Sequence, residues 1–262
     1  MCIRDSPNIL PIEDKEVSLE LKTIFEKRKI NIKTNSMVNK LESLKTKVKV
    51  HLKDGSIIEA DKALVAIGVK GNTEDLGLEE LGVDISNNII NVNKYMQTNV
   101  NNIYAIGDVA GPPWLAHVAS AEGMVAAEHL SNHKNIGMEY DNIPGCTYCH
   151  PEVASIGMTE EVAKEKGYDL KIGKFPFRAL GKAMATGDTE GFVKVIFDNK
   201  YGELLGCHII GSGATDLIIE AGIARKLETT WDEILLTVHP HPTLSEAFLE
   251  ATADALKEAI HI

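Results

Sequence analysis

Two short apolar runs, each ending at a glycine, limit the folds open to this chain more than any other feature. Residues 63–67 (ALVAI) precede Gly68, and residues 103–106 (IYAI) precede Gly107 and Asp108. Neither run alternates polar and apolar residues, so each predicts a strand that is buried on both faces of a parallel sheet. Helices must then cover both faces of that sheet. The first part of the chain is therefore expected to have an α/β architecture.

The pattern changes near Asp141. Strands are predicted at 169–177, 191–197 and 204–210, with a tight turn at DNKYGE between the last two. Helices are predicted at 213–227, at 230–236 behind a Thr230/Glu233 capping box, and from Leu244 onward. An antiparallel sheet followed by helices is an α+β arrangement. The chain of 262 residues therefore joins an α/β part to an α+β part, which its length allows.

Local signals place the remaining elements. Apolar residues at helical spacing predict a helix at 13–30, and strands follow at 32–38, 47–52 and 56–60. Asp54-Gly55 between the last two strands is a strong hairpin signal. A helix with small residues on one face is predicted from Leu115 to Leu130, and Thr159 is a predicted helix N-cap.

Charge and composition exclude several classes of function. The net charge of −11 argues against a nucleic-acid partner, because neutralising phosphates requires clustered Lys and Arg. No apolar run approaches the roughly 18 residues of a membrane span. MCIRDSPNIL lacks the apolar core of a secretory signal. The four cysteines are too few for a disulfide scaffold, so we expect free thiols in a reducing, cytoplasmic compartment.

The segment HPHPTLSEAF, residues 239–248, is the strongest chemical signal. Prolines on both sides of His241 stiffen the backbone that carries its ring, and Glu246 follows at the start of a helix. A carboxylate on one ring nitrogen would set the tautomer and leave the other nitrogen free to accept a proton. The alternative is that Glu246 only caps the helix. His239 has no carboxylate at comparable spacing and is interpreted as structural.

Other motifs are less specific. Asp108 follows a predicted strand at Gly107, where it could accept hydrogen bonds from ligand hydroxyls, or it is an ordinary turn residue. The helix after Pro112-Pro113 starts with free N–H groups that suit an anion, or it is simply initiated by proline. Cys146 and Cys149 are interpreted as inert thiols, with a metal site that includes His150 as the weaker reading. No GxGxxG or P-loop pattern occurs.

Taken together, these stretches resemble the pyridine-nucleotide-disulfide oxidoreductases from about Pro7 to the end. The stretches that carry the resemblance are LPIEDKEVS, ALVAIG, LGLEELGV, NIYAIGDVAGPPWLAH, EGMVAAEHL, HPEVASIGMTEE and GFVKVIFDNKYGELLGCHIIGSGATDLI. The His-x-His-Pro-Thr-Leu-Ser-Glu element favours the dihydrolipoamide dehydrogenase branch over glutathione and mercuric reductases.

The resemblance implies a role for each part of the chain. Residues 1–70 would be the remainder of an NAD-binding domain, 71–140 a central segment that contacts FAD, and 141–262 an antiparallel-sheet dimerisation domain. His241 would be the acid/base toward the dihydrolipoyl thiol, oriented by Glu246. FAD would contact Asp108, Leu115, Ala116 and His117, whereas Gly68 and Val38 would lie near NAD. The implied partners are a second copy of the chain and a lipoyl-bearing protein of a 2-oxoacid dehydrogenase or glycine cleavage complex.

The departures from the family pattern matter equally. The redox cysteine pair and the glycine motifs of the family's first half have no counterpart here, and Cys146 and Cys149 match that pair in neither position nor surroundings. Residues 1–6 resemble nothing in the family, so a non-native origin of this stretch is left open. We therefore expect the polypeptide alone to be inactive. A dimerisation or binding module without chemistry is the alternative.

Overall fold

The computed structural model describes residues 1–262, which form two compact units. The first unit combines residues 1–63 with 142–262, and the second comprises residues 64–141. The domain boundaries expected near residues 70 and 140 remain predictions. None of the helices is both long and apolar enough to cross a bilayer.

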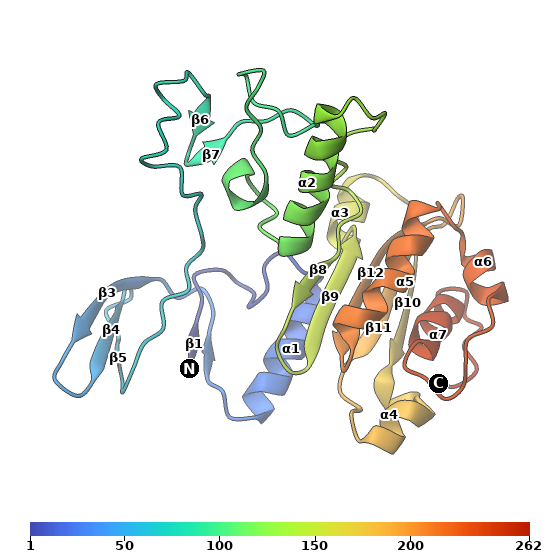
Figure 1. Cartoon of the computed structure of the whole chain (residues 1–262). Helices are drawn as coiled ribbons and strands as arrows, with labels where there is room; N and C mark the ends of the chain where they lie inside the picture. The colour runs from blue at the N-terminus through green and yellow to red at the C-terminus, as the bar shows by residue number, and fades with distance from the viewer. The chain divides into compact units, whose positions relative to one another are not determined.

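A five-stranded antiparallel sheet forms the centre of the first unit (Figure 1). Its strands are β8 (Gly145–Thr147), β9 (Glu152–Gly157), β10 (Leu170–Pro176), β11 (Phe192–Asp198) and β12 (Leu204–Gly211), in the order β10-β11-β12-β9-β8. The turn at DNKYGE joins β11 to β12 in register, with Val195 opposite Cys207. The α+β expectation for this part of the chain is confirmed.

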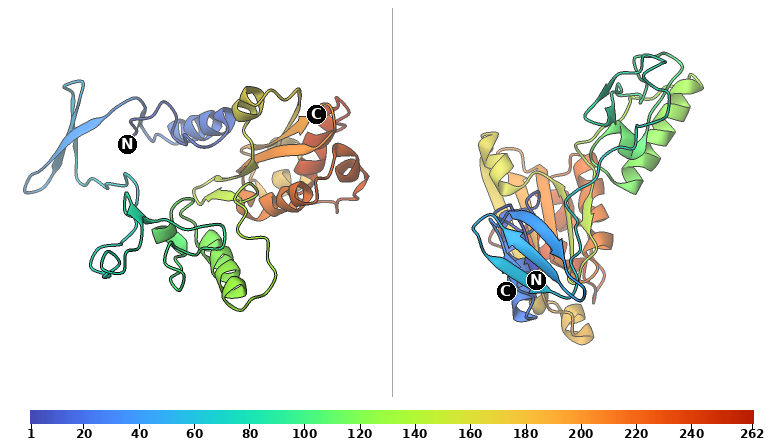
Figure 2. Two further views of the ribbon diagram at one scale, coloured as in Figure 1. Left: turned by 90° about the horizontal axis from the view of Figure 1, so that it is seen from above. Right: turned by 90° about the vertical axis from the view of Figure 1, so that its left-hand side faces the viewer.

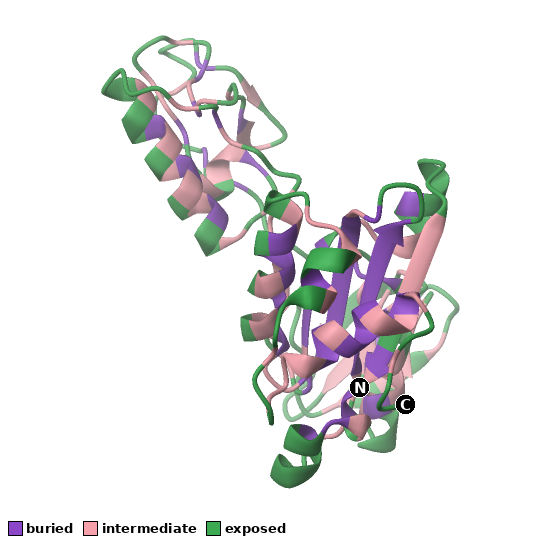
Figure 3. Ribbon diagram, turned by 90° about the vertical axis from the view of Figure 1, so that its right-hand side faces the viewer, coloured by how far each residue is buried: buried purple, intermediate pink, exposed green.

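Helices cover both faces of this sheet. Val193, Val195 and Phe197 belong to the core formed with α5 (Ala214–Lys226) and α7 (Glu246–Ala255). Phe192 faces the opposite side, where α1 (Lys15–Lys27) packs through Val17, Leu21 and Ile24. Because both faces are covered, β11 and β12 are buried along their whole length (Figure 3).

Short helices complete the first unit. Thr159 caps α3 (Glu160–Glu165), accepting a hydrogen bond from the Val162 N–H. The predicted capping box of Thr230 and Glu233 is present at α6 (Trp231–Leu236). A 3-10 turn η2 (Phe177–Ala179) and α4 (Gly181–Thr186) follow β10 and were not predicted.

A small separate sheet precedes the central one in the chain. Its strands β3 (Val38–Ser43), β4 (Val48–Leu52) and β5 (Ile57–Ala60) pair in that order (Figure 2). The Asp54-Gly55 hairpin is confirmed: Gly55 has φ 86°, which suits glycine, and Asp54 accepts a hydrogen bond from the Ser56 N–H at 2.8 Å. The predicted strand at 32–38 is instead divided between β2 (Ile32–Lys33), which pairs with β1 (Cys2–Ile3), and the start of β3.

A buried lysine ties α1 to the central sheet. The Lys194 side chain on β11 is 1% exposed, and its Nζ lies 3.1 Å from both carboxylate oxygens of Asp14, which is itself 3% exposed. The same Nζ lies 2.9 Å from Glu16 and 2.6 Å from Glu160. Asp14 also caps α1 by accepting the Glu16 N–H. Three carboxylates from α1 and α3 thus surround one ammonium group beneath the sheet.

The second unit has little regular structure. It contains β6 (Ile85–Ser86), β7 (Ile89–Ile90), the 3-10 turn η1 (Gly107–Ala110) and α2 (Ala116–Leu130). The two strands predicted at 63–67 and 103–106 are wrong: the first segment has no regular structure, and the second contributes one isolated bridge, Tyr104 to Gln97. A central strand of a parallel sheet needs neighbouring strands to pair its backbone and helices to cover its faces, and no strand of this chain pairs with residues 63–67. Leu64 and Ile67 are accordingly 93% and 94% exposed.

Candidate functional site

His241 and Glu246 meet in the connection between α6 and α7. The His241 Nδ1 lies 2.8 Å from Glu246 Oε1, and the peptide bond from His241 to Pro242 is cis. Glu246 Oε2 accepts a hydrogen bond from the Thr243 N–H at 2.8 Å. The same carboxylate therefore binds both the imidazole and the main chain of Thr243, just before α7. It does not act only as a helix cap, because the N-cap residue of α7 is Ser245 and the Thr243 hydroxyl bonds the Pro240 carbonyl instead of the helix.

The charge state of Glu246 determines which nitrogen of His241 is free. Burial alone would raise the carboxyl pKa, but the hydrogen bonds from the Thr243 N–H and the His241 ring lower the pKa of Glu246 overall. An ionised Glu246 accepts a hydrogen bond from Nδ1–H, so the neutral ring keeps its lone pair on Nε2. The His241 side chain is 74% exposed, and its Nε2 has no hydrogen bond within the chain. This nitrogen can accept a proton from a group outside the chain.

His239 lies two residues away and has its own carboxylate. Its Nε2 is 2.7 Å from Glu220 Oε1 on α5, and its Nδ1 is 2.9 Å from the carbonyl oxygen of Thr237. The expectation that His239 lacks a carboxylate partner is wrong. The partner lies 19 positions earlier on another helix, where spacing within the segment could not reveal it.

Asp108 lies in η1, which packs against α2 in the second unit. Its carboxylate is exposed and accepts no hydrogen bond from the chain, so it is available for hydroxyl groups of a ligand. The backbone around it is held firmly: the Gly107 N–H donates to Glu122 Oε2 at 2.7 Å, and Trp114 Nε1 donates to the Asp108 carbonyl at 3.2 Å. The structure thus presents an unsatisfied acceptor on a fixed turn.

The start of α2 presents the other predicted flavin contacts. Leu115 is the N-cap residue and offers no side-chain hydrogen bond to the first turn, and Ala116 and His117 are exposed. Main-chain N–H groups at such a helix start suit an anionic ligand edge. Asp108 and residues 115–117 therefore belong to one unit and one packed pair of elements, which fits a flavin contact surface.

The two residues predicted near NAD lie apart in the chain's organisation. Gly68 is in the extended, exposed segment of the second unit, with open space around its α-carbon. Val38 starts β3 in the first unit and is 42% exposed. Gly68 and Val38 thus belong to different compact units, and their role with NAD remains a prediction.

The two cysteines of CTYC are thiols rather than thiolates at neutral pH. Burial raises the pKa of both Cys146 and Cys149, and Cys149 Sγ donates to the Pro151 carbonyl at 3.0 Å. No group of three or more His, Cys, Asp or Glu side chains is placed to hold a metal ion.

Two acidic residues near the predicted sites were not predicted from the sequence. Glu220 is the carboxylate that holds His239, and Glu122 is a buried carboxylate, 2% exposed, that accepts from both the Gly107 N–H and the Tyr140 hydroxyl. The available signal was a single acidic residue within an apolar helical stretch, LIIEAGI for Glu220 and ASAEGMV for Glu122. Glu122, which is buried, needs hydrogen-bond donors, whereas the Glu220 side chain is 36% exposed.

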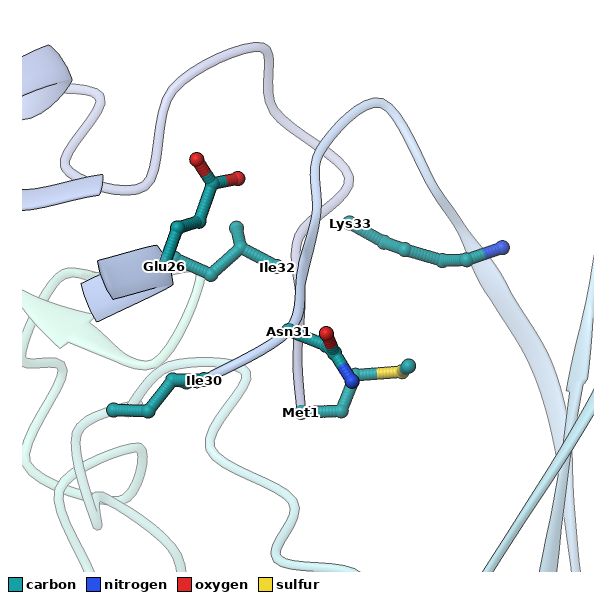
Figure 4. Close-up of a pocket in the computed structure, with 6 residues that line it drawn as sticks. All are labelled: Met1, Glu26, Ile30, Asn31, Ile32 and Lys33. Atoms are coloured by element: carbon teal, nitrogen blue, oxygen red, sulfur yellow. The ribbon is translucent and has the colours of Figure 1, made fainter. Parts of the chain in front are cut away.

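A surface pocket elsewhere carries none of the predicted site residues. It lies beside β1 and β2 and is lined by Met1, Glu26, Ile30, Asn31, Ile32 and Lys33 (Figure 4). Met1 forms one wall of this pocket. The pocket adds nothing to the chemistry of His241.

Comparison with known proteins places this geometry in a family. Residues 143–252 match the profile of the pyridine nucleotide-disulphide oxidoreductase dimerisation domain, and residues 1–123 match that of the pyridine nucleotide-disulphide oxidoreductases. The chain belongs to the pyridine nucleotide-disulphide oxidoreductase family. Both the predicted family and the predicted fold class are thereby confirmed. The matched range includes residues 1–6, so the expectation that this stretch resembles nothing in the family is wrong.

Named relatives of this family narrow the comparison. The chain is 47% identical over 254 residues to dihydrolipoyl dehydrogenase of Rhizobium etli, which covers 95% of the chain and 53% of the relative. It is 46% identical to dihydrolipoyl dehydrogenase of Zymomonas mobilis, with 99% and 57% covered. Among solved structures, LpdA of Mycobacterium tuberculosis superposes with a TM-score of 0.89 at 27% identity, over 95% of the chain and 55% of that protein. The chain spans about half the length of the proteins it matches.

Enzymes of the pyridine nucleotide-disulphide oxidoreductase family use FAD and NAD. The five-stranded sheet with α5, α6 and α7 corresponds to the family's dimerisation domain, since residues 143–252 contain all these elements except the last residues of α7. The dyad of His241 and Glu246 therefore lies within the dimerisation domain.

Proposed function

We propose that this chain supplies the proton acceptor and the dimer interface of a dihydrolipoyl dehydrogenase. The observation that carries the proposal is the His241–Glu246 pair: Nδ1 is bonded to a carboxylate at 2.8 Å, the ring is 74% exposed, and Nε2 has no partner within the chain. An imidazole used only for packing would be buried or bonded at both nitrogens. The pair of His241 and Glu246 therefore leaves Nε2 of His241 free to accept a proton from a molecule bound at this surface.

Proton transfer at Nε2 is the step that these residues perform. A dihydrolipoyl thiol gives its proton to Nε2 of His241, and Glu246 stabilises the imidazolium that forms. The thiolate is then the nucleophile toward a redox disulfide, which it opens in forming a mixed disulfide. In the complete reaction two thiols become a disulfide, and NAD⁺ takes up a hydride. Bound FAD would supply the redox chemistry that links oxidation of the dithiol to reduction of NAD⁺.

A flavin would contact the second unit along η1 and α2. The exposed carboxylate of Asp108 would accept hydrogen bonds from flavin-chain hydroxyls, and the main-chain N–H groups at the start of α2, at Leu115, Ala116 and His117, would suit an anionic part of the flavin. Gly68 and Val38 are proposed to lie near NAD.

A two-fold dimer brings the dyad to its substrate. Along α5 and its C-cap residue, the exposed apolar side chains Ile219, Ile223 and Leu227 recur every four positions. Val238, three residues before His241, is 93% exposed. Apolar side chains in such a row are typical of a face that a second subunit covers. We propose that His241 faces the redox disulfide of the partner subunit across this interface. The lipoyl-bearing substrate protein belongs to a 2-oxoacid dehydrogenase or a glycine cleavage complex.

The 262-residue polypeptide by itself is proposed to be inactive. Burial raises the pKa of the Cys146 and Cys149 thiols, which disfavours the thiolate that a redox pair uses, and no GxGxxG is present to hold a pyrophosphate. A partial flavin surface loses most of the contacts that offset the entropy of binding. These same observations favour a second candidate function, a dimerisation or binding module without chemistry. The four free cysteines support a reducing, cytoplasmic compartment.

Reconstitution tests the first candidate. The chain is coexpressed with the N-terminal half of the Rhizobium etli relative, and dihydrolipoamide-dependent NAD⁺ reduction is compared for the unaltered chain, His241→Gln and His261→Gln. His261 is a matched control, since it is also exposed and bonded to a carboxylate, Glu250. His241→Gln is expected to lower kcat by about 10²–10⁴-fold, the contribution of a general base, while His261→Gln keeps full activity. Equal activity of all three would refute the assignment of His241.

A separate experiment tests whether the chain alone is inactive. The chain is purified without its counterpart, and the absorption spectrum is recorded after incubation with FAD and desalting. No stoichiometric flavin band is expected. A retained flavin band, or turnover by the chain alone, would contradict this proposal without affecting the role of His241.

A further inference from the structure

His239 occupies a different environment from His241, although only Pro240 separates them. The His239 side chain is 4% exposed, whereas that of His241 is 74% exposed. Both nitrogens of His239 are engaged, Nε2 with Glu220 Oε1 at 2.7 Å and Nδ1 with the Thr237 carbonyl oxygen at 2.9 Å. The proton-transfer role proposed for His241 leaves this buried ring unexplained.

The partners of His239 define its protonation. A carbonyl oxygen and an ionised carboxylate are both acceptors, so a ring with a single proton would direct a lone pair at one of them. Both hydrogen bonds form only when both nitrogens carry protons, and the resulting imidazolium is neutralised by Glu220. The hydrogen bond with Glu220 raises the pKa of His239 against the opposing effect of burial, in agreement with this geometry.

The bonds of His239 fix one end of the segment that carries His241. Through Thr237 and Glu220, the ring ties the chain before Pro240 to α5. At the other end, the Thr243 hydroxyl donates to the Pro240 carbonyl at 2.7 Å, and the Thr243 N–H donates to Glu246. The backbone of His241 is therefore held from both sides, by α5 and by α7.

We propose that His239 is a positioning residue: as an imidazolium clamped between Glu220 and the Thr237 carbonyl, it fixes the segment from Pro240 to Pro242 so that Nδ1 of His241 stays on Glu246. The proposal deepens the function proposed above and rests on it only for the use made of His241. Its structural content is that the tautomer of His241, with the proton on Nδ1, depends on the pair of His239 and Glu220.

Nitrogen-15 NMR of the histidine rings tests this on the whole 262-residue chain. At pH 7.5, His239 is expected to show two protonated nitrogens, and His241 to show a protonated Nδ1 and a bare Nε2. A singly protonated His239 in the unaltered chain would overturn the proposal, and this measurement needs no variant. Signals are assigned by single His→Gln replacements.

Variants then test the coupling. In Glu220→Gln the His239 ring is expected to lose its second proton, and the His241 signals to move toward the tautomer mixture of an unconstrained imidazole. Glu42→Gln is the matched control, because Glu42 holds a different histidine, His51, at 3.0 Å in the hairpin sheet. It should leave His239 and His241 unchanged. Unchanged His241 signals in a Glu220→Gln chain that keeps its far-UV circular dichroism would refute the positioning role.

The two proposals fail in different experiments. If His241→Gln retained full activity after reconstitution, the proposed function would fall while the NMR result for His239 stood. If Glu220→Gln left the His241 tautomer intact, the positioning role would fall while the activity test stood. In the reconstituted enzyme, Glu220→Gln is expected to lower kcat and shift its pH profile, as a change in packing alone would not.

Discussion

Replacing Lys194 with methionine would leave a buried carboxylate without its countercharge. Methionine fills the volume of the lysine stem, so packing between β11 and α1 is largely kept, and the change isolates the charge. Asp14 is 3% exposed and lies 3.1 Å from the ammonium group through both oxygens. Glu16 and Glu160, by contrast, are 44% and 23% exposed and have Lys174 and Lys164 as further partners. The free-energy cost of the substitution therefore comes mainly from the buried Asp14 carboxylate, which loses its countercharge.

The expected loss of unfolding free energy follows from the desolvated charge left on Asp14. Removing one member of a buried ion pair costs about 3–5 kcal/mol, because the other charge remains desolvated. Asp14 still accepts the Glu16 N–H, which offsets part of the penalty and places Lys194→Met near 3 kcal/mol. For a domain of this size, that loss corresponds to a decrease in Tm of roughly 6–12 °C.

Urea denaturation followed by tryptophan fluorescence measures the change in unfolding free energy. Trp231 lies in the first unit with Lys194, and a Trp114→Phe background removes the signal of the second unit. Adding Asp14→Asn to Lys194→Met removes the orphaned charge and is expected to restore 1–2 kcal/mol, to order of magnitude. A loss below about 1 kcal/mol for Lys194→Met, or further destabilisation on adding Asp14→Asn, would refute the reasoning.

Three further predictions follow from the same structure. Gly173→Ala should destabilise the first unit by about 3 kcal/mol, because the new methyl group would lie 1.8 Å from the Ala251 carbonyl oxygen on α7. A Tm equal to that of the unaltered chain would contradict this prediction. Burial opposes ionisation of Glu16, but hydrogen bonds from Lys174 and Lys194 outweigh it and lower the pKa of this carboxyl group. The contribution of Glu16 to stability is therefore complete above about pH 4.5 and is lost as the pH falls through the folded-state pKa. Between pH 5 and pH 3 the Tm of a Glu16→Gln chain should fall less steeply than that of the unaltered chain, and parallel curves would contradict this prediction. Ile223→Asp on the exposed face of α5 should shift the chain from dimer to monomer in light scattering with unchanged circular dichroism, and a persistent dimer would move the interface elsewhere.

The sequence predicted those elements whose signals are local. Asp54-Gly55 specifies its hairpin within four residues, and Thr230 with Glu233 specifies the start of α6 within one turn. The dyad could be anticipated for the same reason, since five positions separate His241 from Glu246 and a helix start brings them together. In each case the residues that interact are neighbours in the chain.

The errors concern partners that are distant in sequence or lie outside the chain. Residues 63–67 have the composition of a buried strand, but composition does not show whether neighbouring strands exist, and here they do not. Glu220 and His239 are 19 positions apart on separate elements, so no periodicity links them. The carboxylates that surround Lys194 likewise come together only through the packing of α1 against β11, and hydrophobic spacing alone does not determine that packing.

The open stretch at Leu64, Val65, Ile67 and Val69 affects how this polypeptide behaves in a cell or a concentrated solution. All four side chains are between 56% and 94% exposed, and the backbone beside them offers unpaired donors and acceptors. Extended apolar segments of this kind are what holdase chaperones and proteolytic quality control capture, and what seeds precipitation at high concentration. The yield of folded material should therefore depend on how promptly another polypeptide covers this stretch after synthesis.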